Sequence, residues 1–222
     1  MQKPLLPAVL AVLLLGGGSL SAAQVEKLPH PQQAVGASLF DVLKQRRSHR
    51  EFSPRELSRL AIGELSWAAQ GITSPEGLRT APSAGALYPL TLRLVIGAVE
   101  GLETGIYRYD PQQHALIHEQ EGDLRQKLAQ AAHNQVWIAE APVIAVFSAD
   151  YARTTKKYGK RGIRYVLMEA GHAGQNLLLQ AEEMGLSSVV VGAFDDQSLK
   201  ALLKLTDKES PLSILPIGYP HR

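Results

Sequence analysis

A short basic segment, residues 46–50, has side chains that could bind an anion. It reads RRSHR, so three guanidinium groups and a hydroxyl group lie within five residues. Like charges this close repel one another unless an anion lies among them, and guanidinium groups match phosphate oxygens with paired hydrogen bonds. From composition alone, a solvated basic loop explains the run equally well. The candidate anion ligands are Arg46, Arg47, Ser48 and Arg50.

A segment of small residues, 81–89, could lie against a flat ligand. Its sequence, APSAGALYP, directly precedes a strand-like run. Small side chains let a loop backbone approach a ligand closely and offer its N–H groups. Taken alone, such a segment is an ordinary loop more often than a binding site. Its candidate contacts are Pro82, Ser83, Ala84 and Gly85.

The run 189–194, VVVGAF, is typical of a buried strand that ends in small residues. Ligands often lie at strand ends in α/β folds, which makes Val191 and Gly192 candidate contacts. A simple strand-to-helix turn explains the same pattern equally well.

Six cations occur between residues 153 and 164, just before the longest predicted helix. The run favours an exposed basic loop, with an anion-binding patch as the alternative. Within it, Lys157 and Tyr158 can donate and accept protons, so they are candidate general acid/base residues. A nucleic-acid-binding surface is a further alternative, but the formal net charge of the whole chain is only +2, which weighs against it.

These segments must be positioned by helices and strands that do not alternate strictly. The spacing of apolar residues predicts a long loop over 72–90 and the following elements. Helices are expected over 38–45, 54–70, 123–132, 136–140, 163–184 and 197–205, and strands over 91–97, 105–110, 114–119, 142–148, 187–192 and 212–217. The order favours an α+β fold with a layered sheet.

The predicted helix 163–184 is apolar on most of its sides. A helix of this kind is buried on most sides. Gly171 and Gly174 in its middle each lower helix stability by about 1 kcal/mol relative to alanine. We therefore expect another segment to approach the helix backbone closely at these two positions.

Length and composition bound the class of protein. The chain has 222 residues, 45% of them hydrophobic, and no cysteine. These values predict one globular domain without disulfides, thiolate metal sites or a cysteine nucleophile, and no other metal-ligand pattern stands out. The small net charge gives no indication of a nucleic-acid partner.

The N-terminal residues 1–23 resemble a secretory signal rather than part of the fold. A Leu-rich run from Leu5 to Leu15 follows Lys3, and small residues stand at Ser21 and Ala23. Such a pattern predicts cleavage after Ala23 and a periplasmic or secreted protein without stable membrane insertion. An uncleaved N-terminal anchor is the alternative. Residues 24–37 then form a linker or N-terminal arm, and 38–222 the domain.

Taken together, the motifs resemble the nitroreductase superfamily of FMN flavoproteins, and most closely its SagB-type branch, which includes thiazoline and oxazoline oxidases. The matching segments occur in order along residues 38–222: 46–50, 82–89, 165–176 with 185–186, 191–194 and 216–220. The resemblance implies a nitroreductase-like α+β fold. In that fold a mixed central sheet is flanked by helices, and a long buried helix lies at the interface of a homodimer.

The resemblance also implies how FMN is bound. Segment 46–50 would hold the phosphate and ribityl chain, and segment 82–85 of the partner subunit would lie against the isoalloxazine ring. The backbone N–H of Gly192 would approach the flavin N5 side. The implied cofactor residues are Arg46, Arg47, Ser48, Arg50, Pro82, Ser83, Ala84, Gly85, Val191, Gly192 and Arg222.

Two departures from classical nitroreductases favour the SagB-type branch. Ala86 stands where oxygen-insensitive nitroreductases typically carry Asn, and Gly192 stands where they carry an acidic residue. The Lys-Tyr pair of azoline oxidases corresponds by resemblance to Lys157 and Tyr158. The implied activity is ping-pong hydride transfer through FMN on an unidentified small molecule or peptide. A catalytically degenerate protein that binds a flavin or another anion is the alternative.

The electron donor is open at this stage. NAD(P)H is scarce outside the cytoplasm, and the chain has no dinucleotide-binding fingerprint. One hypothesis is an oxidation that returns electrons to oxygen or to a membrane carrier.

Overall fold

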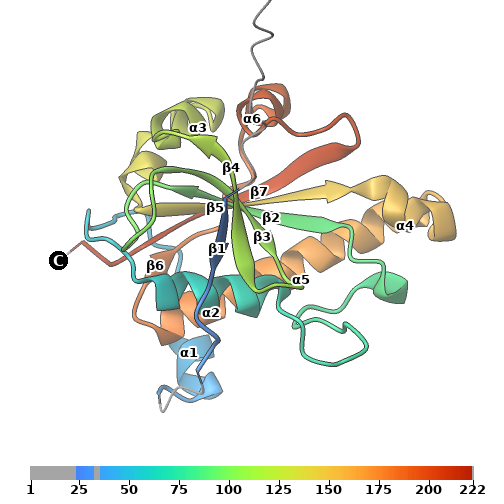
Figure 1. Cartoon of the computed structure of the whole chain (residues 1–222), viewed down its shortest axis with the longest axis horizontal. Coiled ribbons are helices and arrows are strands. Elements are labelled where there is room, and N and C mark those ends of the chain that lie inside the picture. The colour runs from blue at the N-terminus through green and yellow to red at the C-terminus, as the bar shows by residue number, and fades with distance from the viewer. Residues whose placement is uncertain (1–23, 33–35, 222) are drawn as a thin grey trace, which may run out of the picture.

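A computed structural model describes residues 24–32 and 36–221 of the chain, so the predicted signal segment 1–23 and the candidate ligand Arg222 lie outside the described residues. Seven strands form one central sheet in the order β1-β4-β3-β2-β5-β7-β6 (Figure 1). The strands are β1 (Val25–Lys27), β2 (Leu90–Ile96), β3 (Gly105–Asp110), β4 (Ala115–Glu121), β5 (Val143–Asp150), β6 (Ser187–Ser188) and β7 (Glu209–Gly218).

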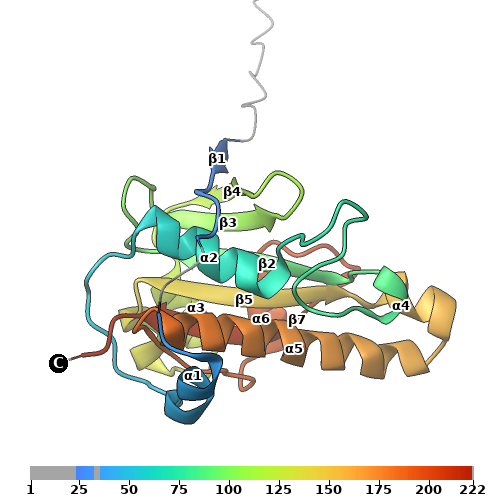
Figure 2. The same cartoon turned by 90° about the horizontal axis from the view of Figure 1, so that it is seen from below.

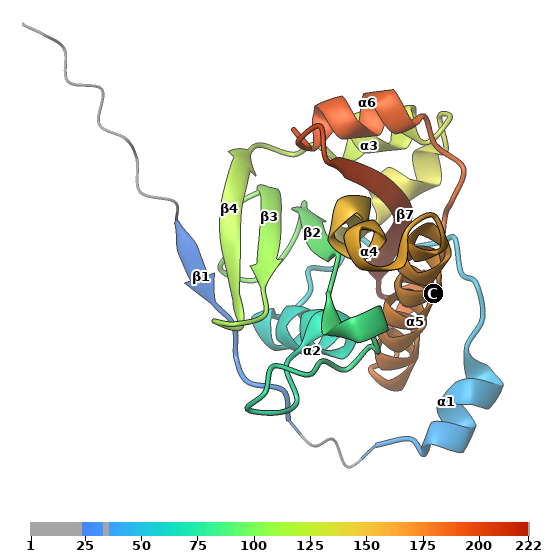
Figure 3. The same cartoon turned by 90° about the vertical axis from the view of Figure 1, so that its right-hand side faces the viewer.

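Helices cover both faces of this sheet. Figure 3 shows α2 and α5 on one face and α3 and α6 on the other. The helices are α1 (Leu39–Gln45), α2 (Arg59–Gln70), α3 (Arg125–Ala131), α4 (Tyr151–Tyr158), α5 (Arg161–Glu183) and α6 (Asp196–Leu202), with short 3₁₀ turns η1 (Ala84–Ala86) and η2 (Val136–Glu140). The predicted α+β class is confirmed. One detail differs from the expected mixed sheet: within the described ranges, every pairing between the named strands is antiparallel.

Alternating side chains of the central strands build two cores. On β5, Val143, Ala145 and Phe147 join the core under α2 and α5. Ile144 and Val146 join the core under α3 and α6. Because side chains on a strand point alternately to opposite faces, a continuous apolar run such as 143–147 requires a layer on each face.

The start of α2 differs from the sequence expectation. The helix was expected to open at Pro54, but it begins at Arg59 because the Ser58 hydroxyl accepts a hydrogen bond from the N–H of Ala61. Leu57 is held outside the helix as a fully buried residue whose backbone bridges to Val99. A capping serine and a buried anchor together outweigh the proline signal.

The structure differs from three other expectations. The basic run expected as a loop forms α4, which Asp150 caps by accepting from the N–H of Ala152. The strand expected over 187–192 pairs regularly only at β6, and Val191 then makes an isolated bridge to Ile214. The segment 24–37, expected as a linker or arm, contributes the edge strand β1, which pairs with β4.

Helix α5 is long and only partly covered. Ile163, Leu167 and Met168 are 47%, 51% and 53% exposed. Apart from the neighbouring residues and backbone of the same helix, no described atom lies within 4 Å of where a Cβ atom would stand at Gly171 or Gly174, so no other described segment makes the close approach expected there. None of the helices in the described ranges is both long and apolar enough to span a bilayer.

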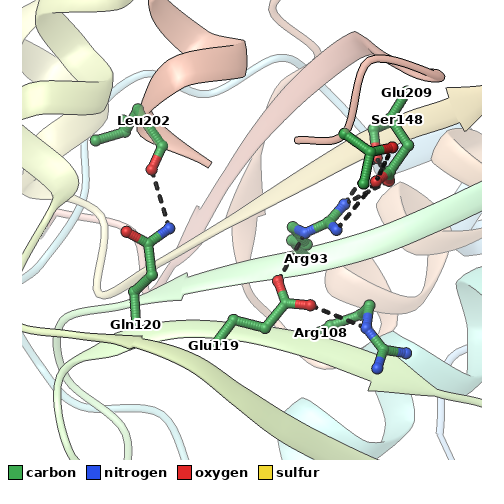
Figure 4. Close-up of polar contacts among 8 residues, drawn as sticks. Arg93, Arg108, Glu119, Gln120, Ser148, Leu202 and Glu209 are labelled. Carbon is green, nitrogen blue, oxygen red and sulfur yellow. Dashed lines mark hydrogen bonds and ion pairs between the residues drawn. The ribbon is translucent and has the colours of Figure 1, made fainter. Parts of the chain in front are cut away.

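A cluster of ion pairs crosses the sheet on the face that carries α3 and α6 (Figure 4). Arg93 on β2 donates from Nε to Glu119 at 2.8 Å and from Nη1 to Glu209 at 2.9 Å. Arg108 donates to the second oxygen of Glu119 at 2.9 Å. Burial raises the pKa of Glu209, but the hydrogen bond and charge of Arg93 outweigh burial and hold this pKa below its usual value. The cluster ties β4, β2 and β7 together.

Candidate functional site

The basic segment 46–50 lies beyond the C-terminal end of α5. The N–H of His49 donates to the carbonyl of Ser188 at 3.1 Å, and the N–H of Ser53 donates to the carbonyl of Tyr219 at 2.8 Å. Phe52, which lies between these two bonds, is buried at 2% exposure. The segment is therefore fixed between β6 and the C-terminal residues of the chain.

The side chains of this segment divide into two roles. Arg47 donates from Nη1 to the carbonyls of Lys44 and Arg46 at 2.9 and 2.8 Å, so it closes the C-terminal end of α1. Ser48 and Arg50 line a cavity of about 300 Å³. Among the described residues, Arg46, Ser48 and Arg50 donate no side-chain hydrogen bond. The cavity is also lined by His49, Glu51, Ser187, Pro220 and His221.

The Arg50 guanidinium lies 5.8 Å from the centre of the Trp137 ring, on η2. Next to η2, Gln135 donates to the carbonyl of Ala193 at 3.1 Å. These contacts bring the segment after β6 to the same region as the basic segment. Val191 exchanges two backbone hydrogen bonds with Ile214 at 2.8 and 2.9 Å, whereas Gly192 is exposed. Of these two candidates, the Gly192 backbone is the accessible one.

The second group of predicted residues lies at the other end of α5. Gly85 in η1 has φ of +65°, a left-handed conformation that favours glycine. A Cβ atom at this position would lie 2.8 Å from Tyr158 Oη and 2.9 Å from Lys157 Nζ. The Tyr158 ring meets Tyr165 of α5 edge-on, with ring centres 5.2 Å apart. The structure therefore brings the small-residue loop and the Lys-Tyr pair together.

The loop that carries Gly85 has an uncommon backbone. Ala86 and Tyr88 have φ of +53° and +46°, which is strained for residues other than glycine. The Ser83 hydroxyl accepts from the N–H of Tyr88 at 2.9 Å, and the Tyr88 hydroxyl accepts from the N–H of Arg79 at 3.2 Å. Such side-chain bonds hold the strained turn in one conformation.

A buried carboxyl group behind this loop was not predicted from the sequence. Glu169 on α5 is 3% exposed, and its Oε1 has no hydrogen-bond partner among the described residues. Burial raises the pKa of Glu169 to about 7, although the Ser83 hydroxyl and the charges of Arg79 and Arg153 act in the opposite direction. The signal was present, because Glu169 lies three residues after Val166 and four before Ala173 on the apolar stripe of the helix.

Arg79 is a half-buried polar group at the same end of α5. Its Nη1 donates to Gln70 Oε1 at 2.6 Å, and its guanidinium lies 4.4 Å from the centre of the Tyr88 ring. Burial lowers the pKa of Arg79. Arg79 therefore joins α2 to the loop, and its charge acts on the Glu169 carboxyl.

The two groups of predicted residues do not meet within one chain. Figure 2 shows α4 at one end of α5 and the C-terminal residues at the other. A helix of 23 residues is roughly 34 Å long at 1.5 Å per residue. The basic segment with Gly192 and the Gly85 loop with Lys157 and Tyr158 therefore form two half-sites.

Known proteins are similar to this chain in sequence and in fold. The profile of the Nitroreductase family matches residues 43–219. MJ1384 of Methanocaldococcus jannaschii, a protein assigned to the nitroreductases, is 43% identical over 81% of this chain and 90% of its own length. An FMN reductase [NAD(P)H] of Bacillus subtilis is 32% identical over 55% of each chain. A crystal structure from Ralstonia eutropha, also assigned to the nitroreductases, has a TM-score of 0.76 at 29% identity and covers 89% of this chain and 90% of its own.

The family profile spans most of the chain, and the relatives share its fold. The protein therefore belongs to the nitroreductase family of oxidoreductases.

Proposed function

We propose that the protein is an FMN-dependent oxidoreductase of the SagB-type branch, and that each active site combines the basic segment of one subunit with the Gly85 loop of the other. The observation that carries this proposal is the placement of the two half-sites at opposite ends of α5. The basic segment provides an anion-binding group but no acid/base pair. The Gly85 loop provides the small residues and the acid/base pair but no anion-binding group.

The residues present fit FMN at both half-sites. Arg46, Ser48 and Arg50 provide the donors that a phosphate group requires, and two of them line the 300 Å³ cavity. The exposed backbone of Gly192 provides a further donor near this end. At the other half-site, the small residues of 82–85 leave room for a flat ring. Arg47 is the exception, since its guanidinium serves α1.

When bound, FMN supplies the hydride chemistry, accepting and returning electron pairs in two half-reactions. The protein supplies positioning and proton transfer. Lys157 Nζ and Tyr158 Oη lie side by side at Gly85, so one can hold a proton while the other passes its proton to or from a substrate. The Ser83 hydroxyl of this loop lowers the pKa of the buried Glu169 carboxyl behind it.

Two copies of α5 packed through their exposed faces would complete the sites. The apolar surface of Ile163, Leu167 and Met168 is available for such a contact. Gly171 is exposed and leaves space beside the helix backbone for a second helix to approach, whereas Gly174 is buried within the chain. A twofold axis across antiparallel α5 helices would place the basic segment of one chain next to the Gly85 loop of the other. Homologues with this fold are commonly dimers.

Three features support the SagB-type branch over a classical nitroreductase. Ala86 and Gly192 replace the polar residues that the classical enzymes carry. The contact of Lys157 and Tyr158 with the small-residue loop gives the pair a place beside the proposed ring. The substrate is then a small molecule or a peptide that exchanges electrons with FMN.

Export is the second part of the proposal. The pattern of residues 1–23 supports cleavage after Ala23 and a periplasmic or secreted location. In that compartment, electrons from a substrate would pass to oxygen or a membrane carrier rather than come from NAD(P)H. Turnover with NADPH at a low KM would contradict this donor assignment.

The test is an absorbance spectrum of the purified full chain with and without added FMN. We expect flavin absorbance bands that remain after gel filtration, bleach with dithionite and return with an electron acceptor. The variant R46A/R50A should lose FMN, whereas the matched variant K127A/K208A should keep it. A chain that stays colourless after incubation with FMN contradicts the proposal. A bound flavin that no acceptor reoxidises would instead indicate a catalytically degenerate binding protein.

A further inference from the structure

We propose that the exposed cations around the turn between α4 and α5 recognise an anionic organic substrate. This basic hairpin comprises Arg153, Lys156, Lys160, Arg161 and Arg164. The inference rests on the proposed function and deepens it by naming the substrate class, a small molecule that carries a carboxylate or phosphate group.

The basic hairpin has no acidic partners of its own. All five side chains are exposed, and residues 151–168 contain no Asp or Glu. Among the described residues, each recorded ion pair is formed by an arginine or lysine outside the hairpin. Asp150, directly before this range, caps the start of α4, and Glu169, directly after it, is buried and feels the charge of Arg153. Within one chain, the positive charge of the hairpin is therefore not neutralised by an ion pair and is available to an anion.

The helix geometry increases this positive charge. Helix α5 begins beside Lys160 with no side-chain cap and no acidic residue in its first turn. The N-terminal end of a helix carries a partial positive charge, which favours anions and disfavours Lys and Arg. Helices α2, α3 and α4 likewise have no acidic residue in the first turn, whereas α1 and α6 each have an Asp there. The first turn of α5 departs from what helix stability favours, as functional sites often do.

The basic hairpin lies at the proposed reaction site. Lys156 and Lys160 flank Lys157 and Tyr158, whose polar atoms lie against Gly85. Arg161 donates from Nε to Tyr165 Oη at 3.3 Å, and the Tyr165 ring packs against Tyr158. A substrate anion held by the hairpin would therefore be close to the acid/base pair.

The charge of the rest of the chain favours a small anion over a nucleic acid. With Lys157, the hairpin holds six of the 23 basic residues, which leaves 17 bases against 21 acids elsewhere. A long polyanion bound at the hairpin would extend over this net negative remainder and be repelled. A small carboxylate or phosphate would meet only the positive patch, where Arg and Lys bind both groups.

The test uses two electron acceptors of the same shape, 4-nitrobenzoate and neutral 4-nitrobenzamide. The rate constants for reoxidation of the dithionite-reduced FMN protein by each are compared at low and high NaCl. Equilibrium binding of each compound to the oxidised protein is measured by calorimetry, which requires no turnover. The variant K156Q/K160Q removes two hairpin charges, and K127Q/K208Q removes two exposed charges elsewhere.

We expect the native protein to be reoxidised about tenfold faster by the nitrobenzoate than by the nitrobenzamide. In K156Q/K160Q the rate constant for the nitrobenzoate alone should fall about fivefold, since exposed charge pairs contribute modestly and are screened by salt. The control variant should match the native protein. Equal rates and equal binding of the two compounds, with a working redox cycle, would overturn the inference and leave the proposed function intact. A hairpin that instead retains duplex DNA, with retention lost in K156Q/K160Q, would overturn it in favour of a nucleic acid. A protein without FMN contradicts the proposed function, and calorimetry alone then decides whether the hairpin selects anions.

Discussion

Gly85 is in close contact with Tyr158. A Cβ atom at position 85 would lie 2.8 Å from Tyr158 Oη, closer than real Cβ atoms are found to other atoms. The φ of +65° at this glycine adds a second reason for the absence of a side chain. Because position 85 is a glycine, the loop of η1 can lie against Lys157 and Tyr158 of α4, which follow about 70 residues later in the chain.

The first prediction concerns this contact. The variant G85A should displace Tyr158 and Lys157 and lower turnover of bound FMN about tenfold, since a misplaced catalytic group is costly. The matched variant G77A changes a glycine with φ of +82° that has no described atom within 4 Å of its Cβ position. Both variants should lose about 1 kcal/mol of stability from backbone strain, but only G85A should lose turnover. Equal turnover in the two variants would contradict the close contact.

The Lys-Tyr pair should affect proton transfer and not cofactor binding. We expect Y158F and K157M each to lower the rate of substrate turnover about a hundredfold or more, the usual contribution of a general acid/base group. Titration with FMN, followed by flavin fluorescence, should give dissociation constants close to that of the native protein. A variant that turns over normally would exclude that residue from the chemistry.

Glu169 should make stability depend on pH in the direction opposite to a typical carboxylate. Its pKa in the folded protein, about 7, lies above the ordinary 4.5, so the folded state binds more protons than the unfolded state between these values. Stability from this group therefore falls as the pH rises from 4.5 to 7. The variant E169Q should be more stable than the native protein at pH 8 by about 3 kcal/mol, with the difference vanishing near pH 4.5.

The measurement is urea unfolding of the native protein and E169Q from pH 5 to pH 8. The half-buried Glu182 on the same helix provides the control E182Q, which should keep the pH profile of the native protein. Parallel profiles for E169Q and the native protein would show that Glu169 is ionised in the fold.

In the ion cluster of Figure 4, a buried arginine, Arg93, and an exposed arginine, Arg108, bind the same carboxylate, Glu119. The side chain of Arg93 is 7% exposed, and that of Arg108 is 36% exposed. Removing Arg93 leaves Glu119 and Glu209 without their buried partner, so R93M should cost about 3–5 kcal/mol of unfolding free energy. R108M should cost less than about 1 kcal/mol. Similar losses in urea unfolding would contradict the burial of the cluster.

Much of the fold follows from local patterns. The strands predicted over 105–110 and 114–119 are confirmed as β3 and β4, which pair as a hairpin because alternating apolar residues flank a short turn. The helix expected over 38–45 forms α1, which Ser38 caps by accepting from the N–H of Asp41. The start of α2 and the helix α4 were predicted wrongly for the same reason, because each depends on a contact with a segment elsewhere in the chain. Leu57 pairs with Val99, and α4 packs on α5. Neither contact can be inferred from the local sequence.

The candidate site is predictable only in its parts. The types and order of residues indicated segments 46–50 and 82–85 and the Lys-Tyr pair, and the structure places the last two together. Within one chain, the basic segment lies apart from the Gly85 loop and the Lys-Tyr pair, because the 23-residue helix α5 separates them. Arg47 looks like a phosphate ligand by type, yet its neighbours in space are the open carbonyls at the end of α1.

The two-subunit site is tested most directly by complementation. R46A/R50A lacks one half-site and Y158F lacks the acid/base group of the other, so each variant alone should be inactive. Coexpressed and purified together, they should recover about one quarter of native activity, because about half of the dimers are mixed and each mixed dimer has one intact site. Size-exclusion chromatography should show dimers throughout. A mixture as inactive as its two components would show that each site lies within a single chain, and would contradict this account.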